Sequence, residues 1–261
     1  MRFKSYLLAE LPEKSFVADW TNKSMYKKEV LLIIPAYNEE ANIAFVVDEI
    51  AENYPEFDYV VIDDGSSDDT KRICKNRGYN IISLSVNLGL AGAFQTGMRY
   101  AYQKGYKYAV QFDGDGQHSA KYIQAMKVEA DNGAEIVIAS RFFKKKKPMS
   151  LRMIGSSLIS LAVMITTGTR LTDPTSGMRM YSSRAIEEFA LNINYGPEPD
   201  TVSYLIKQGI RVSEVQAQMK ERQGGKSYLT FFNSIKYMIR MLVSIIFIQN
   251  FRKRDLKYSK K

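Results

Sequence analysis

The sequence predicts an α/β fold with a mostly parallel central sheet flanked by helices. Apolar runs of strand length alternate with helix-length segments between residues 30 and 139, and polar or glycine-rich residues follow each run. This alternation is typical of βαβ units, whose right-handed crossovers lay helices on the sheet. No Gly-x-Gly-x-x-Gly follows the first strand and no Gly-x-x-x-x-Gly-Lys-Ser/Thr occurs. Ordinary dinucleotide and P-loop folds therefore lose their main sequence support.

The elements follow from apolar runs and from the residues that end them. The expected strands are 30–35, 59–63, 81–84, 108–112 and 136–139, and the expected helices are 38–54, 68–78, 87–104, 119–132 and 153–169. Asn38 is the expected N-cap of the first helix, with Glu39 and Glu40 in its first turn. Gly78, Gly105 and Gly133 stand where glycine commonly ends a helix.

Composition limits the class of protein. The chain has 261 residues, 45% of them apolar and 25% charged, as in an ordinary globular protein. The chain has a single cysteine, Cys74, which excludes a disulfide framework and fits a reducing cell compartment. Cys74 lies in a segment expected to be helical, and we expect its side chain to be buried in the protein. The net charge of +9 includes the run Lys144 to Lys147 and a basic C-terminal tail from Arg252, which favour nucleic acid, anionic lipid or simple solubility. No signal peptide is visible in residues 1–29.

Four polar clusters follow strands of the predicted sheet, at residues 35–39, 63–68, 87–92 and 113–118. In open α/β sheets, ligands bind beyond the carboxyl ends of the strands. The sequence therefore predicts that these clusters form one site.

Asp113 and Asp115 are the centre of that site. Alternate residues of an extended segment point the same way, so the two carboxylates can converge on one point. Such a pair repels unless a cation or a shared proton lies between them, and a hard divalent ion such as Mg²⁺ or Mn²⁺ suits oxygen ligands. The alternative is an ordinary Asp-Gly turn at a strand end.

The chain resembles the family 2 glycosyltransferases of the GT-A (Rossmann-like) fold. It is most similar to the branch containing dolichyl-phosphate mannose synthase and bacterial polyprenyl-phosphate glycosyltransferases. The segments that carry the resemblance are 34–39 (Ile-Pro-Ala-Tyr-Asn-Glu), 61–66 (Val-Ile-Asp-Asp-Gly-Ser), 87–89 (Asn-Leu-Gly), 112–118 (Phe-Asp-Gly-Asp-Gly-Gln-His), 140–142 (Ser-Arg-Phe), 173–179 (Asp-Pro-Thr-Ser-Gly-Met-Arg) and 222–227 (Arg-Gln-Gly-Gly-Lys-Ser).

The resemblance implies roles for the matching residues. The implied nucleotide-sugar site comprises Pro35, Tyr37, Glu39, Asp63, Asp64, Asn87, Gly89, Arg222 and Ser227. The implied metal ligands are Asp113, Asp115 and Gln117. The divalent cation and Arg222 would stabilise the leaving diphosphate. The family inverts the anomeric centre by direct displacement.

The acceptor decides whether a base is needed. A lipid phosphate is already anionic, and the resemblance implies that Arg141, Ser176 and Arg179 hold it. A sugar hydroxyl needs a base, for which the candidates are Glu198 and Asp200. The alternative is a surface ion pair for Arg141 and a strand-edge charge for Arg179. Glu198 and Asp200 are equally interpretable as first-turn acids of a helix. His118 either joins the site or packs beneath it.

Two segments bear on a membrane. The segment Met153 to Thr169 is uncharged but short for a span, which favours a helix that is buried or lies at an interface. The segment Tyr228 to Phe251 is apolar but interrupted by Lys236 and Arg240, which favours an amphipathic helix on an anionic membrane surface over a span. The alternative is a helix packed on the domain. We expect no pair of C-terminal transmembrane helices of the kind found in several polyprenyl-phosphate enzymes.

These observations predict a metal-dependent inverting glycosyltransferase at the cytoplasmic face of the cell membrane, bound peripherally. It moves a sugar from a nucleotide diphosphate to a polyprenyl-phosphate-type lipid. The alternative is a hydroxyl of a polysaccharide or glycolipid in cell-envelope assembly. The expected organisation is an extension (1–29), a GT-A domain (30–227) and a membrane-associated C-terminal segment (228–261). A nucleotide-sugar-binding regulatory subunit fits less well, and nucleic-acid binding lacks any accompanying motif. The oligomeric state is open.

Overall fold

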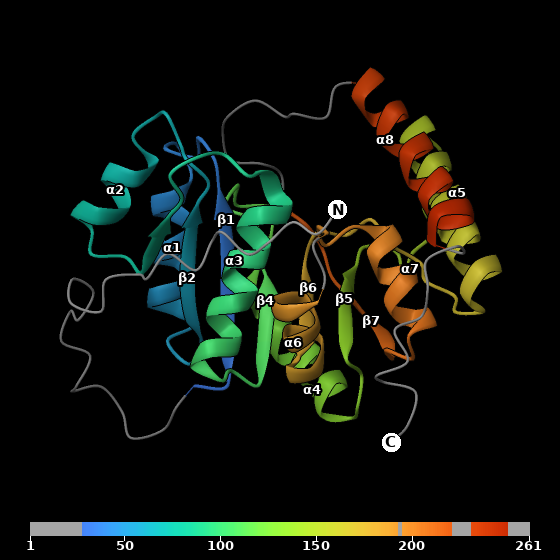
Figure 1. Cartoon of the computed structure of the whole chain (residues 1–261), viewed down its shortest axis with the longest axis horizontal. Helices are drawn as coiled ribbons and strands as arrows, with labels where there is room; N and C mark the ends of the chain where they lie inside the picture. The colour runs from blue at the N-terminus through green and yellow to red at the C-terminus, as the bar shows by residue number, and fades with distance from the viewer. Residues whose placement is uncertain (1–27, 193–194, 221–230, 250–261) are drawn as a thin grey trace, which may run out of the picture.

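The computed structural model describes residues 28–192, 195–220 and 231–249. These residues form a seven-stranded sheet in the order β3-β2-β1-β4-β6-β5-β7 with helices on both faces (Figure 1). The strands are β1 Val30–Ala36, β2 Asp58–Asp63, β3 Ile81–Ser83, β4 Tyr108–Gln111, β5 Ile136–Ser140, β6 Arg179–Ser182 and β7 Val212–Gln216. The helices are α1 Ile43–Asn53, α2 Thr70–Asn76, α3 Gly89–Lys104, α4 Ile123–Asp131, α5 Leu151–Thr167, α6 Ser183–Leu191, α7 Pro199–Lys207 and α8 Phe231–Val243. A single 3-10 turn (Ala120–Tyr122) precedes α4 and a π-helix (Ser244–Ile248) follows α8.

The mostly parallel sheet predicted from the sequence is confirmed. β1 pairs in parallel with β2 and β4, β2 with β3, and β5 with β7. β6 is the exception, since it runs antiparallel between β4 and β5. Neither β6 nor β7 was among the strands predicted from the sequence.

The continuous apolar run of β1 is explained by helices on both faces of the sheet. Leu31 and Ile33 pack into the core that contains α3 and α6, whereas Leu32 and Ile34 pack into the core that contains α1 and α4. Successive strand residues face opposite sides, so a strand covered on both faces has no polar side. Burying each such side chain stabilises the fold by about 1.5–3 kcal/mol.

The predicted start of the first helix was wrong. Asn38 has a positive φ of 54°, and its side chain holds the neighbouring loop by accepting a hydrogen bond from the Ser67 backbone N–H at 2.9 Å. α1 begins at Ile43, after Asn42. An asparagine tolerates the left-handed conformation and bonds across a loop as readily as it caps a helix.

α5 and α8 pack side by side at one end of the molecule (Figure 1). Gly155 makes this approach possible, because a Cβ at its position would overlap the sulfur of Met238. One side of α5 is buried, whereas several of its apolar side chains are exposed: Ile154, Leu158, Leu161, Met164 and Ile165. Among the described residues, no helix is long and apolar enough to cross a bilayer.

Candidate active site

The loops that follow β1, β2 and β4 meet at one edge of the sheet. These strands are parallel neighbours, and the register sets Ala36 beside Asp63 at their carboxyl ends. The loop after β4 lies against the end of β1, since a Cβ on Gly114 would come within 3.2 Å of the Pro35 carbonyl oxygen. The sheet thus brings the predicted clusters around Pro35, Asp63 and Asp113 to the same edge.

The loops after β1 and β2 are fastened to each other by backbone-to-side-chain hydrogen bonds. The backbone N–H of Asn38 donates to Ser66 Oγ at 3.0 Å, and that of Glu39 donates to Thr70 Oγ1 at 2.9 Å. The Glu39 carboxylate accepts from Asn42 Nδ2 at 2.8 Å. These bonds hold the loop that carries Tyr37 in place without any ligand.

Asp63 and Asp64 are both buried at the end of β2. Asp63 accepts a hydrogen bond from Ser66 N–H at 3.0 Å, and Asp64 accepts one from Leu88 N–H at 2.8 Å. Burial raises the pKa of Asp64, against the opposing effect of the backbone hydrogen bonds it accepts. Asp64 therefore ties the N-terminus of α3 to β2.

The Asn87 cluster joins the same edge through a glycine. Gly65 has a φ of 69°, and a Cβ there would lie 2.9 Å from the backbone N of Asn87. Only glycine allows these two loops to approach so closely. The Asn87 side chain accepts from Gly89 N–H at 3.0 Å, at the start of α3. All four predicted clusters therefore lie at one edge.

The loop after β4 is closed by hydrogen bonds from two of its own motif residues. The Asp113 backbone N–H donates to His118 Nδ1 at 2.9 Å, and Gln117 N–H donates to Asp115 Oδ1 at 3.0 Å. His118 Nε2 lies 3.4 Å from Asp113 Oδ2, and the imidazole is buried. His118 thus packs beneath the site, and Asp113 and Asp115 are only half-buried.

The donor atoms of this loop fit a hard divalent cation. Two carboxylates and one amide, from Asp113, Asp115 and Gln117, offer oxygen ligands of the kind that Mg²⁺ and Mn²⁺ prefer. In the described part of the chain, no group of three or more His, Cys, Asp or Glu side chains is placed to hold a metal ion. A cation here would therefore need further ligands, and substrate phosphate oxygens commonly supply them.

Glu198 and Asp200 lie at the N-terminus of α7, as first-turn acids would, and both are bound by the C-terminal helical segment. Tyr237 Oη donates to Glu198 Oε2 at 2.5 Å, and Ser244 Oγ donates to Asp200 Oδ2 at 2.6 Å. Arg240 lies 3.9 Å from the second oxygen of Glu198. The structure thus gives both acids hydroxyl partners, and a catalytic role for them stays a prediction.

The three predicted acceptor-phosphate residues have different surroundings. Ser176 is buried and donates to the Ala139 carbonyl at 2.6 Å. Arg179 is also buried and donates to the backbone carbonyls of Pro174 and Pro197. Only the guanidinium of Arg141 is partly exposed, with 26% of its side chain accessible. A phosphate role for Ser176 and Arg179 stays a prediction without geometric support: both side chains are buried, the Ser176 hydroxyl and both terminal nitrogens of Arg179 donate to backbone carbonyls, and Arg179 Nε is buried without a partner among the described residues.

Arg141 is held by a buried chain of acids that sequence reasoning missed. Asp173 accepts Arg141 Nε at 2.7 Å and its second nitrogen at 2.8 Å, a bidentate pair. Glu214 on β7 in turn accepts the backbone N–H of Asp173 at 2.8 Å and that of Thr172 at 2.7 Å. In the sequence, Glu214 shows only as an acid between Val212 and Val215, in a segment that was not predicted to be a strand.

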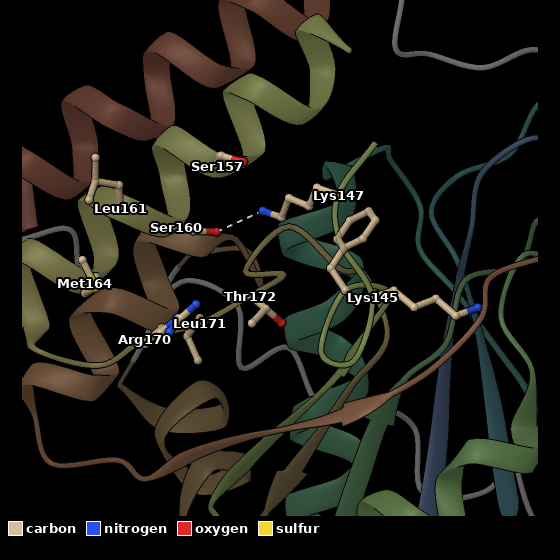
Figure 2. A pocket seen from close by; sticks show the side chains of 10 residues that line it. Lys145, Lys147, Ser157, Ser160, Leu161, Met164, Arg170, Leu171 and Thr172 are labelled. Carbon is tan, nitrogen blue, oxygen red and sulfur yellow. Dashed lines mark hydrogen bonds between the residues drawn. The ribbon is translucent and has the colours of Figure 1, made fainter. Parts of the chain in front are cut away.

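A cavity of about 310 Å³ lies between α5 and two segments that are its neighbours in the sequence, residues 142–147 before it and residues 170–172 after it (Figure 2). Its lining residues are Phe142, Lys145, Lys147, Ser157, Ser160, Leu161, Met164, Arg170, Leu171 and Thr172. Lys147 points at α5 and donates to Ser156 Oγ at 3.1 Å and Ser160 Oγ at 3.2 Å. Burial and the nearby Arg141 lower the pKa of Lys147. The cavity therefore combines cations with an apolar wall. The run Lys144 to Lys147, just after the Arg141 motif, was its sequence signal.

Arg222 and Ser227, the predicted diphosphate contacts, lie outside the described residues.

Comparisons with known proteins agree with this architecture. The family model described as glycosyl transferase family 2 matches residues 31–190. An undecaprenyl-phosphate mannosyltransferase from Micrococcus luteus is 33% identical over 214 residues, which cover 77% of this chain and 87% of the relative. A UDP-N-acetylglucosamine–dolichyl-phosphate N-acetylglucosaminyltransferase from Methanococcus voltae is 34% identical over 187 residues, 62% of this chain and 73% of the relative.

A crystal structure supports the fold. Glucosyl-3-phosphoglycerate synthase from Mycobacterium tuberculosis, crystallised with Mn²⁺, uridine diphosphate and phosphoglyceric acid, superposes with a TM-score of 0.64 at 17% identity. The match covers 87% of this chain and 80% of that one. The family model spans more than half of the sequence, and the relatives fall in the polyprenyl-phosphate branch. The chain therefore belongs to glycosyltransferase family 2 and is a glycosyltransferase.

Proposed function

We propose that this enzyme transfers a sugar from a nucleotide diphosphate to a polyprenyl-phosphate-type lipid. The observation that carries the proposal is the cavity beside α5. Its lining includes the cations Lys145, Lys147 and Arg170, and the apolar side chains Leu161 and Met164 of α5. An amphiphile with an anionic head and an apolar tail matches both kinds of lining residue, whereas a neutral saccharide matches neither.

The charge balance at the cavity favours an anion. Arg141, whose guanidinium lies 5.2 Å from the ring centroid of the lining residue Phe142, has a carboxylate partner in Asp173, whereas Lys147 is half-buried among serine hydroxyls. Burial lowers the pKa of Lys147, and Arg141 adds to this effect, whereas Asp173 opposes it. A phosphate bound here would stabilise the protonated amine by opposite charge. A lipid monophosphate would also use the planar donors of Arg141.

The donor nucleotide is assigned to the edge formed by the loops after β1, β2 and β3. Pro35, Tyr37 and Glu39 belong to the end of β1 and its loop, Asp63 and Asp64 to the end of β2, and Asn87 and Gly89 to the segment that begins α3. Arg222 and Ser227 are proposed to contact the diphosphate. Because the connecting hydrogen bonds already hold the loops, little ordering is required when the nucleotide binds.

Asp113, Asp115 and Gln117 are proposed to hold a divalent cation, Mg²⁺ or Mn²⁺, next to the donor diphosphate. When bound, the cation offsets the negative charge that develops on the leaving diphosphate. The residues of this chain hold the two substrates in line, so that the acceptor oxygen displaces the diphosphate directly and inverts the anomeric centre. A lipid phosphate needs no base, because its oxygen is already anionic near neutral pH.

The exposed apolar faces of α5 and the C-terminal helical segment supply a membrane surface for the lipid. Ile165 on α5 is 72% exposed, and Phe247 and Ile248 after α8 are each 58% exposed. Lys236 and Arg240 on α8 add positive charge, which suits anionic head groups. The enzyme is proposed to bind the cytoplasmic face of the cell membrane peripherally. The names of both relatives contain a polyprenyl-type phosphate, which supports the same acceptor class.

The test is an assay of the purified enzyme with a panel of nucleotide sugars, Mg²⁺ or Mn²⁺, and polyprenyl phosphate in detergent or vesicles. A parallel arm replaces the lipid phosphate with the matching polyprenol, and another with a saccharide. Glycosylated lipid is expected only with the phosphate. Glycosylation of the saccharide but not of the lipid phosphate would overturn the proposal in favour of a hydroxyl acceptor. The two relatives carry different sugars in their names, so the panel includes both mannose and N-acetylglucosamine donors.

A further inference from the structure

His118, the only histidine in the chain, sits directly beneath the first acid of the metal loop. β4 ends at Gln111, and the last backbone bond of this segment runs from Phe112 N–H to the Ile33 carbonyl at 2.9 Å. Asp113 N–H therefore has no strand partner, and His118 Nδ1 accepts it at 2.9 Å. A backbone donor that is largely withdrawn from water is costly to leave without a partner, so this bond helps to fix where the chain leaves the sheet.

The same bond fixes the imidazole tautomer. Nδ1 accepts a hydrogen bond from the backbone N–H, so it carries no hydrogen of its own and the hydrogen of the neutral ring is on Nε2. Nε2 lies 3.4 Å from Asp113 Oδ2, longer than a standard hydrogen bond but close enough for attraction between its N–H and the carboxylate. One ring thus contacts both the backbone and the side chain of Asp113.

The ring has little freedom to move. Phe112 packs edge-on against it, with centroids 5.5 Å apart and planes at 79°. Gly177 closes the opposite approach, since a Cβ there would lie 3.4 Å from both Cε1 and Nε2 of His118 and 2.9 Å from Asp113 Oδ2. Glycine at 177 therefore leaves room for the histidine and the carboxylate together.

We propose that His118 is a positioning residue that sets the orientation of the Asp113 carboxylate before a divalent cation binds. This inference rests on the proposed function, because it takes Asp113 as a ligand. A carboxylate already oriented by its neighbours binds a cation more tightly than one that must be ordered on binding. Replacing a residue that contacts a metal ligand without binding the metal itself typically lowers metal affinity by about 10- to 100-fold.

The experiment is a Mn²⁺ titration followed by electron paramagnetic resonance, with the nucleoside diphosphate present and no acceptor. His118→Phe keeps the ring volume but removes both nitrogens, and it is expected to weaken Mn²⁺ binding by about 10- to 100-fold. His118→Asn keeps an acceptor near the Nδ1 position and removes Nε2, so its loss is expected to be smaller. Gly177→Ala retains the histidine but places a methyl group against the Asp113 carboxylate. It tests the same orientation of Asp113 if the His118 variants do not fold. It is also expected to weaken Mn²⁺.

The control is Phe57→Leu, which alters a buried aromatic of the same core on the chain just before β2. It should lower the melting temperature without changing Mn²⁺ affinity. If the His118 and Gly177 variants bind Mn²⁺ as the unmodified enzyme does, the positioning role is wrong. If the unmodified enzyme itself binds no Mn²⁺ with nucleotide, the proposed metal site is wrong. The two failures are therefore distinct.

Discussion

The phenol of Tyr237 on α8 donates a hydrogen bond of 2.5 Å to Glu198 at the N-terminus of α7. Burial and the neighbouring Glu198 raise the pKa of Tyr237 far above its usual range, so the phenol remains a donor at physiological pH. Ser244 makes a parallel bond to Asp200 at 2.6 Å. These two bonds join the C-terminal helical segment to Glu198 and Asp200. These acids are the candidates for the general base that a hydroxyl acceptor would require.

Replacing these acids separates the two acceptor classes. Glu198→Gln and Asp200→Asn are expected to retain kcat within about tenfold, because a phosphate acceptor gives up no proton. Removing a general base typically costs about 10²- to 10⁴-fold. Tyr237→Phe is the control for loss of the hydrogen bond alone and should lower the melting temperature by as much as Glu198→Gln. A loss of kcat of more than about a hundredfold in one acid variant, with a normal melting temperature, would identify that acid as a base.

Glu214 is expected to control acceptor affinity through Asp173 and Arg141. Glu214→Gln replaces one accepting oxygen by an N–H group facing the backbone donors of residues 172–173, at a cost of about 1–3 kcal/mol. The KM for lipid phosphate should rise by about tenfold or more, with the KM for nucleotide sugar unchanged.

The matched control is Glu135→Gln. Glu135 also accepts a backbone N–H, that of Arg211, and pairs with an arginine, Arg184, at 2.8 Å, but it lies at the amino end of β5. It should cost comparable stability and leave both KM values unchanged. Equal effects of the two variants on the KM for the lipid would contradict the relay to Arg141.

Asp64→Asn is expected to stabilise the fold while weakening donor binding. Burial raises the pKa of Asp64, so its ionised form lowers stability at pH 7. An amide oxygen still accepts from Leu88 N–H without the buried charge, and the free energy of unfolding should rise by up to about 1 kcal/mol. This gain should shrink as pH falls through the folded-state pKa of Asp64, because the wild-type carboxyl is then protonated.

The opposite sign is expected for Asp69→Asn, since Arg72 lowers the pKa of Asp69. Its destabilisation should be present at pH 7 and should vanish as pH falls. Urea unfolding of both variants between pH 4 and pH 8 measures the effect. A loss of stability for Asp64→Asn at pH 7 would show that the hydrogen bonds to the ionised carboxylate outweigh its burial.

Membrane association is expected to depend on the exposed residues of α5 and of the segment after α8. Ile165→Asp and Phe247→Asp should each weaken binding to anionic vesicles by about tenfold or more, because a charge replaces an apolar side chain worth about 1.5–3 kcal/mol on burial. Val128→Asp is the control: Val128 is 51% exposed on α4, away from α5 and α8 (Figure 1). Sedimentation with vesicles measures the difference, and an equal loss in all three variants would argue against a defined docking face.

The sequence was sufficient to predict the parallel half of the sheet and the single edge that gathers its loops. Both depend on local signals, which are apolar runs of strand length and helices that end at residues such as Gly78 and Gly105, both with positive φ. The carboxyl ends of parallel strands then meet at one edge whatever the details of packing.

Long-range pairing accounts for most of what the sequence did not predict. β6 has only four residues, begins with Arg179, and inserts antiparallel between β4 and β5. The contacts of Arg141 with Asp173, and of Asp173 with Glu214, join residues 32 and 41 positions apart. Such pairs depend on the tertiary arrangement and leave no periodic pattern. The role of His118 likewise depends on the fold of the loop after β4, which places the backbone N–H and the carboxylate of Asp113 against its ring.

The linkage and anomeric configuration of the reaction product test the central claim most directly. The product of the purified enzyme, its preferred nucleotide sugar and polyprenyl phosphate would be examined by phosphorus and proton NMR. The account predicts a sugar joined through its anomeric carbon to the lipid phosphate, with phosphorus coupling to the anomeric proton and a configuration opposite to that of the donor. A sugar attached to a hydroxyl, or a product with the donor's configuration, would contradict it.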